Sequence, residues 1–153
     1  ENVQILTLMA VSMAVCTADT WASEIGLVFR QKTYDIVRFK TVPPGLSGGI
    51  SVAGTIGGLA GALAMALFCN LLLFDGLNVH FIFKITFLGT FGMLLDSVLG
   101  ATWQARFRKN DLETDMELPG STLANGHRWF DNDAVNVVSN AVVVGLSVGW
   151  LVF

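Results

Sequence analysis

Several acidic side chains lie in or beside long apolar segments, where they could hold a metal ion. Asp19 and Glu24 lie near the end of the first apolar run, Asp96 lies within the third, and Asp133 and Asn136 open the last. An ionisable residue inside a membrane segment is costly and by default suggests a function. We expect Asp19, Asp96 and Asp133 to hold Mg²⁺ through oxygen ligands, with Glu24 and Asn136 completing the catalytic set.

The spacing of Asp19 and Glu24 limits how they can act together. The two residues are five positions apart in the sequence, which is about 140° around an ideal helix. Both carboxylates can therefore reach one ion only if the helix breaks near Trp21. Without such a break they serve different roles.

A second candidate site is the glycine-rich stretch VPPGLSGGISVAG at residues 42–54. Glycines after a proline turn let backbone N–H groups converge on an anion, and the start of the following helix favours the same charge. No Gly-Lys-Ser/Thr follows as in a Walker loop, and helix packing would explain the glycines equally well. The candidate ligands of nucleotide phosphates are Ser47, Gly48, Gly49, the upstream Arg38 and Lys40, and Gln104.

The elements that position these residues are apolar helices. The chain has 153 residues, a mean hydropathy of +0.62 and only 14% charged residues, whereas soluble domains carry roughly 25%. Four stretches reach the roughly 20 apolar residues that cross a bilayer as a helix. We expect an all-α, polytopic transmembrane bundle in a single domain, 1–153, with further N-terminal helices in the full protein. The predicted helices cover about 3–29, 50–74, 81–103 and 134–153.

The basic residues predict the topology. Of nine Lys and Arg residues, four fall in the connection 30–49 and four in the connection 104–133. The positive-inside rule places both connections on the cytoplasmic side or its organellar equivalent, so that the candidate carboxylates share one membrane face. The acid-rich run NDLETDMEL, 110–118, is expected to be a solvated loop.

Small and polar residues recur at helical spacing and predict which helix faces pack together. Small residues let a neighbouring helix approach closely, so a glycine stripe that includes Asp96 would point this carboxylate into the bundle. On the last helix, Asn140 and Ser139 are expected to form interhelical hydrogen bonds. The stripes are Gly89, Gly92, Asp96 and Gly100; Gly54, Gly58, Ala62 and Ala66; and Asp133, Asn136 and Asn140.

The chain also reads as one pattern used twice. In each half a helix carries an aspartate, a charged connection follows, and a Pro-Gly pair precedes the next helix. Pro44-Gly45 and Pro119-Gly120 are 75 residues apart, and Asp19 and Asp96 are 77 apart. A duplicated two-helix unit is the hypothesis, with chance similarity as its alternative.

Four motifs in order resemble one integral-membrane family. They are ADTWASEIG (18–26), VPPGLSGGISVAG (42–54), LDSVLGATWQ (95–104) and DNDAVN (131–136). The family, known as domain of unknown function 92, contains transmembrane protein 19 and the plant phytyl-phosphate kinase of tocopherol synthesis. The resemblance implies an enzyme that phosphorylates a prenyl-alcohol monophosphate, with CTP or ATP as the phosphate donor.

The sequence therefore favours a Mg²⁺-dependent membrane kinase, and two other classes stay open. An ion-coupled carrier would also use repeats and intramembrane carboxylates, and a structural subunit of a larger membrane complex would use polar residues to lock helices together. The expected partner is a membrane lipid or isoprenoid phosphate, with other membrane subunits left open and no nucleic acid. We expect a multi-pass integral membrane protein, with the plastid envelope, thylakoid and endomembranes as alternatives.

Overall fold

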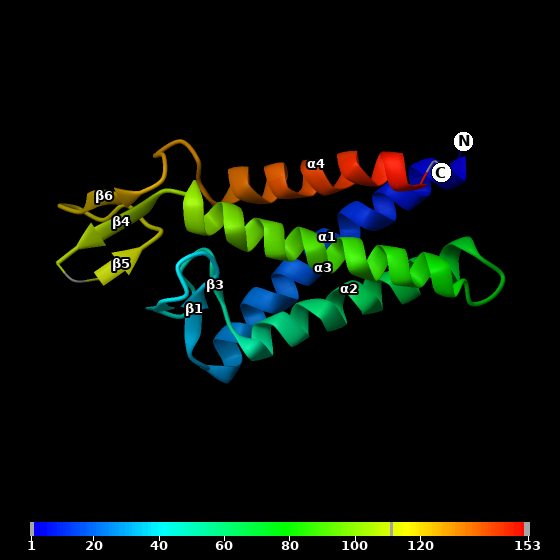
Figure 1. Cartoon of the computed structure of the whole chain (residues 1–153), viewed down its shortest axis with the longest axis horizontal. Coiled ribbons are helices and arrows are strands. Elements are labelled where there is room, and N and C mark those ends of the chain that lie inside the picture. The colour runs from blue at the N-terminus through cyan, green and yellow to red at the C-terminus, as the bar shows by residue number, and fades with distance from the viewer. Residues whose placement is uncertain (1, 111, 152–153) are drawn as a thin grey trace.

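In the described part of the chain, four helices form the body of the protein, and they extend from one end of it toward the other, with the first helix at an angle to the long axis (Figure 1). The computed structural model describes residues 2–110 and 112–151. Each helix begins within two residues of the start predicted from the sequence, and the helical fold class is confirmed. The helices are α1 (Asn2–Phe29), α2 (Val52–Leu73), α3 (Val79–Thr102) and α4 (Asn132–Leu151).

Side chains at the helix starts explain two of these boundaries. Ser51 precedes α2, and its hydroxyl oxygen accepts the backbone N–H of Gly54 at 3.1 Å. Asn78 does the same for α3 through the N–H of Phe81 at 3.1 Å. The first N–H groups of a helix have no intrahelical acceptor, and such caps supply one.

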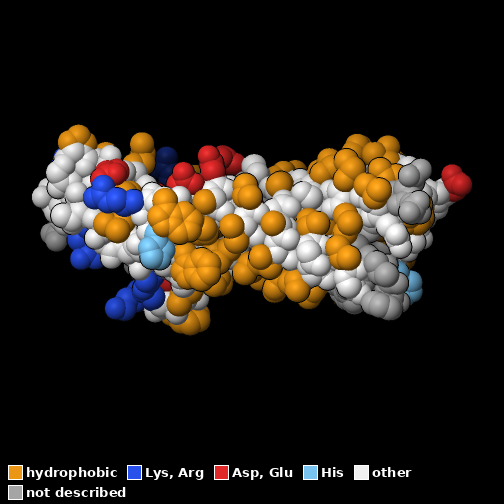
Figure 2. Space-filling view, turned by 90° about the horizontal axis from the view of Figure 1, so that it is seen from above, with side chains coloured by type: hydrophobic (Ala, Val, Ile, Leu, Met, Phe, Trp, Pro, Cys, Tyr) orange, Lys and Arg blue, Asp and Glu red, His pale blue; other side chains and the backbone are white. Residues whose placement is uncertain are grey.

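The helices have the composition of membrane spans. Within the described residues, three helices are long and apolar enough to cross a membrane: α1 from Val3, α2 and α3. Polar residues interrupt the first half of α4, and its membrane crossing stays a prediction. Hydrophobic side chains are spread over the helical part of the face seen in Figure 2, whereas the visible Lys and Arg side chains gather at one end.

Each long connection folds into a small antiparallel sheet, and both sheets lie at that same end (Figure 1). The connection 30–51 contains β1 (Thr33–Asp35), β2 (Thr41–Val42) and β3 (Gly49–Ile50), in the order β2-β1-β3. The connection 103–131 contains β4 (Arg106–Lys109), β5 (Leu112–Thr114) and β6 (Thr122–Asn125), in the order β5-β4-β6. The two connections therefore share one end of the molecule, as the topology prediction requires.

The identical strand order supports the hypothesis of a duplication. In both sheets the first strand is central and the next two strands pair on either side of it. The molecule thus contains two successive helix–sheet–helix units, in which α1 and α3 both run toward the sheets (Figure 1).

The small-residue faces pack as predicted. Gly54, Gly58, Ala62 and Ala66 are all buried on α2, and Gly89, Gly92 and Gly100 are buried on α3. An added Cβ at Gly58 would lie 2.9 Å from the carbonyl oxygen of Ala18 in α1, and one at Gly92 would lie 2.6 Å from Val15. A larger side chain at either position would therefore clash with α1, and the small residues allow the helices to pack closely.

Candidate functional site

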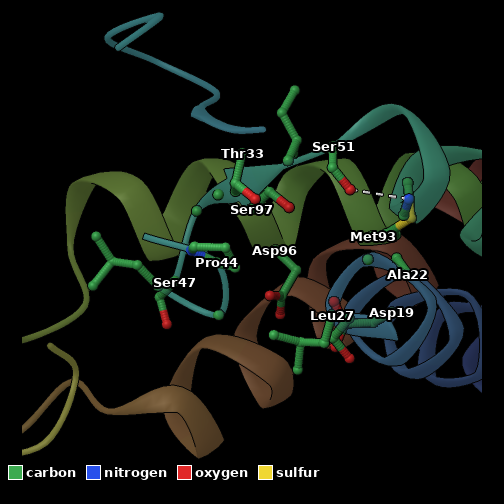
Figure 3. Close-up of a pocket in the computed structure, with 18 of the residues that line it drawn as sticks. Asp19, Ala22, Leu27, Thr33, Pro44, Ser47, Ser51, Met93, Asp96 and Ser97 are labelled. Atoms are coloured by element: carbon green, nitrogen blue, oxygen red, sulfur yellow. Dashed lines mark hydrogen bonds between the residues drawn. The ribbon is translucent and has the colours of Figure 1, made fainter. Parts of the chain in front are cut away.

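A cavity of about 230 Å³ lies where the helices meet the first sheet. Its wall combines the last turns of α1, the glycine-rich stretch, the start of α2, the second half of α3 and Asn132 at the start of α4. Asp19 from α1 and Asp96 from α3 both line it, and Figure 3 shows their carboxyl groups at the same space. The structure therefore brings together two of the three predicted metal ligands.

Asp96 is held by a neighbouring helix. The hydroxyl of Ser139 in α4 donates a hydrogen bond of 3.0 Å to the Oδ2 of Asp96, and Ser139 is 1% exposed. The amide of the next residue, Asn140, donates to the carbonyl oxygen of Ser12 in α1 at 3.1 Å. The interhelical bonds expected of both residues are confirmed, and that of Ser139 fixes one carboxylate of the cavity.

The other acidic residues lie elsewhere. The helix α1 runs unbroken through Trp21, so Glu24 does not join Asp19 at the cavity and is exposed. Asp133 is exposed in the first turn of α4, and Asn136 beside it does not line the cavity either. Among the described residues no three His, Cys, Asp or Glu side chains form a group that could hold a metal ion.

The glycine-rich stretch lines the cavity, but its glycines also serve packing. Gly48 has a φ of +74°, and an added Cβ would lie 2.4 Å from the backbone nitrogen of Ala101 in α3. An added Cβ at Gly49 would lie 2.7 Å from the Cγ2 of Thr33. Substitution at Gly48 would therefore disturb the fold as well as any ligand, so this residue does not give a clean binding test.

The stretch already binds an anionic group, the carboxylate of Asp115. Both the backbone N–H and the hydroxyl of Ser47 donate to its Oδ2, at 2.8 and 2.7 Å. Its other oxygen, Oδ1, is buried without a hydrogen-bond partner. The acid-rich run is therefore not simply a solvated loop, because part of it forms β5 and Asp115 binds the first connection.

Arg38 belongs to an ion-pair cluster between the two sheets. Its guanidinium and that of Arg106 each donate to the Oδ2 of Asp35 at 3.0 Å. The Oδ1 of Asp35 accepts the backbone N–H groups of Val37 and Arg38. Burial raises the pKa of the Asp35 carboxyl, but these hydrogen bonds together lower it by more. The pKa therefore lies below its usual value.

The remaining predicted phosphate ligands lie apart from the cavity. Lys40 is exposed in the turn between β1 and β2. Gln104 is buried, and its backbone forms an isolated β-bridge with His127. Sequence reasoning missed Asp35, Asp115 and Arg106. Their roles depend on contacts between the two connections, made by residues that are 59 to 71 positions apart in the sequence. The sequence carries only a weak signal for them, which is that both connections contain acidic residues close to basic ones.

Comparison with known proteins gives the family directly. The family described as "Integral membrane protein DUF92" matches residues 2–144. The chain is 30% identical over 138 residues to an uncharacterized membrane protein of Synechocystis, covering 90% of this chain and 45% of that protein. No solved structure matches significantly.

Two relatives from Arabidopsis thaliana carry names. Protein PGR is 33% identical over 139 residues, covering 82% of this chain and 48% of that protein. The chloroplastic protein VTE6 is 32% identical over 127 residues, covering 81% and 32%. The chain spans less than half the length of these relatives. With nearly its whole length matched, the chain belongs to the DUF92 family of integral membrane proteins.

Proposed function

We propose that the chain carries the lipid-side site of a membrane kinase, which transfers a phosphoryl group from a nucleoside triphosphate to a prenyl-alcohol monophosphate such as phytyl phosphate. The observation that carries the proposal is the meeting of Asp19 and Asp96, from two apolar helices, at one cavity. The cavity lies at the sheet-bearing end of the helices, where a lipid head group would meet a soluble nucleotide. The motif resemblance and the similarity to VTE6 favour the same class.

The reaction needs little covalent chemistry from the protein. A phosphate oxygen of the acceptor attacks the terminal phosphorus of the donor, whose bond to the bridging oxygen breaks, leaving a prenyl diphosphate and a nucleoside diphosphate. Positioning and charge compensation supply most of the rate enhancement in such transfers. In this proposal Ser139 orients Asp96 and the glycine-rich stretch closes one wall, which would position the substrates. Charge compensation would come from a metal ion held by Asp19 and Asp96.

The carboxylate pair fits Mg²⁺ without a third acidic ligand. Mg²⁺ is commonly held by one or two carboxylates, with substrate phosphates and water filling the other positions. Asp19 and Asp96 would hold the ion, and it would offset the negative charge on the phosphates. Asp133 is not needed for this arrangement.

The test is conversion of the acceptor by purified protein. Phytyl monophosphate, Mg²⁺ and γ-labelled CTP or ATP should yield labelled phytyl diphosphate in wild-type protein and in Glu24→Gln, whose side chain is exposed on α1 outside the cavity. Asp19→Asn and Asp96→Asn should yield almost none. Absence of product with both nucleotides, or equal activity in all four proteins, would reject the proposal.

The repeated helix–sheet–helix unit favours one alternative, an ion-coupled carrier. Many carriers are built from internal repeats with their site at the repeat interface, and Asp19 and Asp96 come from corresponding helices. Uptake of a prenyl phosphate or an ion into proteoliposomes, with no nucleotide consumed, would favour the carrier over the kinase.

A further inference from the structure

A second cavity, of about 550 Å³, lies between the two sheets. It is lined by β1, β2 and the turn between them on one side, and by all three strands of the second sheet on the other. None of its lining residues lines the cavity of Asp19 and Asp96. We name it the inter-sheet cavity, and its volume lies within the range of ordinary small-ligand sites.

The inter-sheet cavity has an excess of positive charge. Among the described residues, four basic side chains line it against two acidic ones, Asp35 and Glu113. Asp35 is already bonded by two guanidinium groups and two backbone N–H groups, and Glu113 is paired with Arg108. Such a hollow lined by one sign of charge concentrates counter-ions. The four bases are Arg38, Lys40, Arg106 and Arg108.

Arg106 supplies a second, independent observation. Its side chain is 4% exposed, and its Nε is buried without a hydrogen-bond partner. The other end of the guanidinium donates to Asp35 and to the carbonyl oxygen of Ser47. Buried donors in native proteins almost always have an acceptor, so Arg106 keeps one unused donor in a side chain that lines this cavity.

Arg106 also connects the two cavities. The residue whose carbonyl oxygen it binds, Ser47, lines the cavity of Asp19 and Asp96. The inter-sheet cavity therefore adjoins the proposed acceptor site, and it lies outside the apolar helices, where a soluble ligand can enter. Arginine forks match phosphate oxygens in geometry and charge.

We propose that the inter-sheet cavity binds the phosphate chain of the nucleoside triphosphate donor, a role that rests on the kinase function proposed above. The donor would thus be held by Arg106, Arg108, Lys40 and Arg38 between the sheets. The glycine-rich stretch then forms the wall between donor and acceptor, with Ser47 kept by Asp115.

The experiment changes two cavity bases that the fold needs least. Lys40 is exposed and makes no ion pair with another described residue, and Arg108 is half-exposed. The double variant Lys40→Gln/Arg108→Gln is compared with Lys32→Gln/Lys109→Gln, which removes the same charge from exposed residues of the same two connections outside the cavity. Binding of inorganic tripolyphosphate, CTP and ATP is measured by calorimetry in nanodiscs of neutral phosphatidylcholine.

The expected result is a loss of affinity on the order of tenfold or more for tripolyphosphate and for the preferred nucleotide in the cavity variant, with the control unchanged. An equal loss in both variants, or none, would overturn the site. In nanodiscs containing phosphatidylglycerol, loss of lipid binding without loss of tripolyphosphate binding would assign the cavity to a lipid head group and overturn the nucleotide assignment.

The same variants separate this inference from the kinase function. Nucleotide binding that depends on Lys40 and Arg108, in a protein that phosphorylates no prenyl phosphate, would support the cavity and reject the kinase. Kinase activity with an unchanged KM for nucleotide in the cavity variant would support the kinase and reject the cavity.

Discussion

The two helix–sheet–helix halves have the same topology, but their sheets have different surroundings. In the first half, added Cβ atoms at Gly48 and Gly49 would lie 2.4 and 2.7 Å from neighbouring atoms. The Pro-Gly turns of the two halves share a left-handed glycine, with a φ of +85° at Gly45 and +79° at Gly120. A Cβ added at Gly45 would lie 3.3 Å from Leu27, whereas one at Gly120 would meet no described residue within 4 Å other than its chain neighbours. The first sheet is therefore a packed wall of the cavity, and the turn of the second is open.

Side chains of the second connection form the hydrogen bonds and ion pairs that hold the first connection in place. Arg106 binds Asp35 and Ser47, and Asp115 binds Ser47 through two hydrogen bonds. Asn125 accepts from Arg38 and also binds the end of α3. A duplication would explain the shared topology and the paired aspartates. The two sheets nevertheless differ in role, because the first lines the site and the second supplies contacts that hold the first connection.

The paired aspartates give the largest expected effect. Asp19→Asn and Asp96→Asn should each lower kcat for phosphoryl transfer by about 10²–10³-fold, because each removes a carboxylate ligand of the proposed Mg²⁺ ion that offsets the charge on the reacting phosphates. Ser139→Ala should lower it only about fivefold, since Ser139 positions Asp96 without touching substrate. Steady-state kinetics with labelled nucleotide measure all three. A large loss for one aspartate alone would mean that the two halves are not equivalent in function.

The contact between the sheets gives the next largest effect. Arg106→Gln should reduce the unfolding free energy by about 3 kcal/mol, because removing one partner of a buried pair leaves the other uncompensated. Arg128→Gln, which breaks an exposed pair with Glu117, should change it by less than about 1 kcal/mol. Thermal unfolding in detergent measures both, and similar melting temperatures for the two variants would contradict the assigned role of Arg106.

A pair of glycine substitutions compares the two connections directly. Gly48→Ala should cost about 3 kcal/mol, because it combines a left-handed backbone with a clash against Ala101. Gly120→Ala has the same backbone strain but open space, and should cost about 1 kcal/mol. Equal losses in melting temperature would show that packing against α3 adds nothing at Gly48.

The helices and their contacts could be read from the sequence because their signals are local and long. A charge-free run such as that of α2 exceeds the length of a membrane span, and glycine recurs at helical spacing on the face that packs. The position of Asp96 inside the bundle followed from the same stripe. A common end for both connections followed from their basic residues.

The sheets and their polar contacts could not be read in this way. Strands of two to four residues are too short to show an alternating pattern. Nothing local indicates that Asp115 would bind Ser47, or that Arg106 would share Asp35 with Arg38, because these contacts join the two halves. Glu24 and Asp133 have the right residue type near the right membrane face, but their helix positions turn them away from the cavity.

The smallest expected effect concerns acid, and it contrasts a buried carboxylate of the first half with an exposed one of the second. The pKa of Asp35 is lowered in the folded protein, so near that pKa the unfolded chain binds more protons than the folded one. Stability then rises with pH across this window. The contribution of Asp35 to folding stability is present above about pH 4, near the ordinary pKa of the group. It is lost as the pH falls through the lower pKa that the group has in the folded protein.

Melting temperatures between pH 7 and pH 3 test this sign. The melting temperature of the wild type should be nearly constant down to about pH 4 and should then fall. Asp35→Asn should have a lower melting temperature at pH 7, and its melting temperature should fall less steeply below about pH 4, the acid limb of the curve. The control Glu117→Gln removes an acid that is half-exposed in its pair with Arg128, and it should leave the acid limb unchanged because an exposed pair is screened by solvent. If Glu117→Gln flattens the limb as much as Asp35→Asn, the acid sensitivity comes from net charge. The buried cluster between the sheets would then not be what distinguishes the two halves.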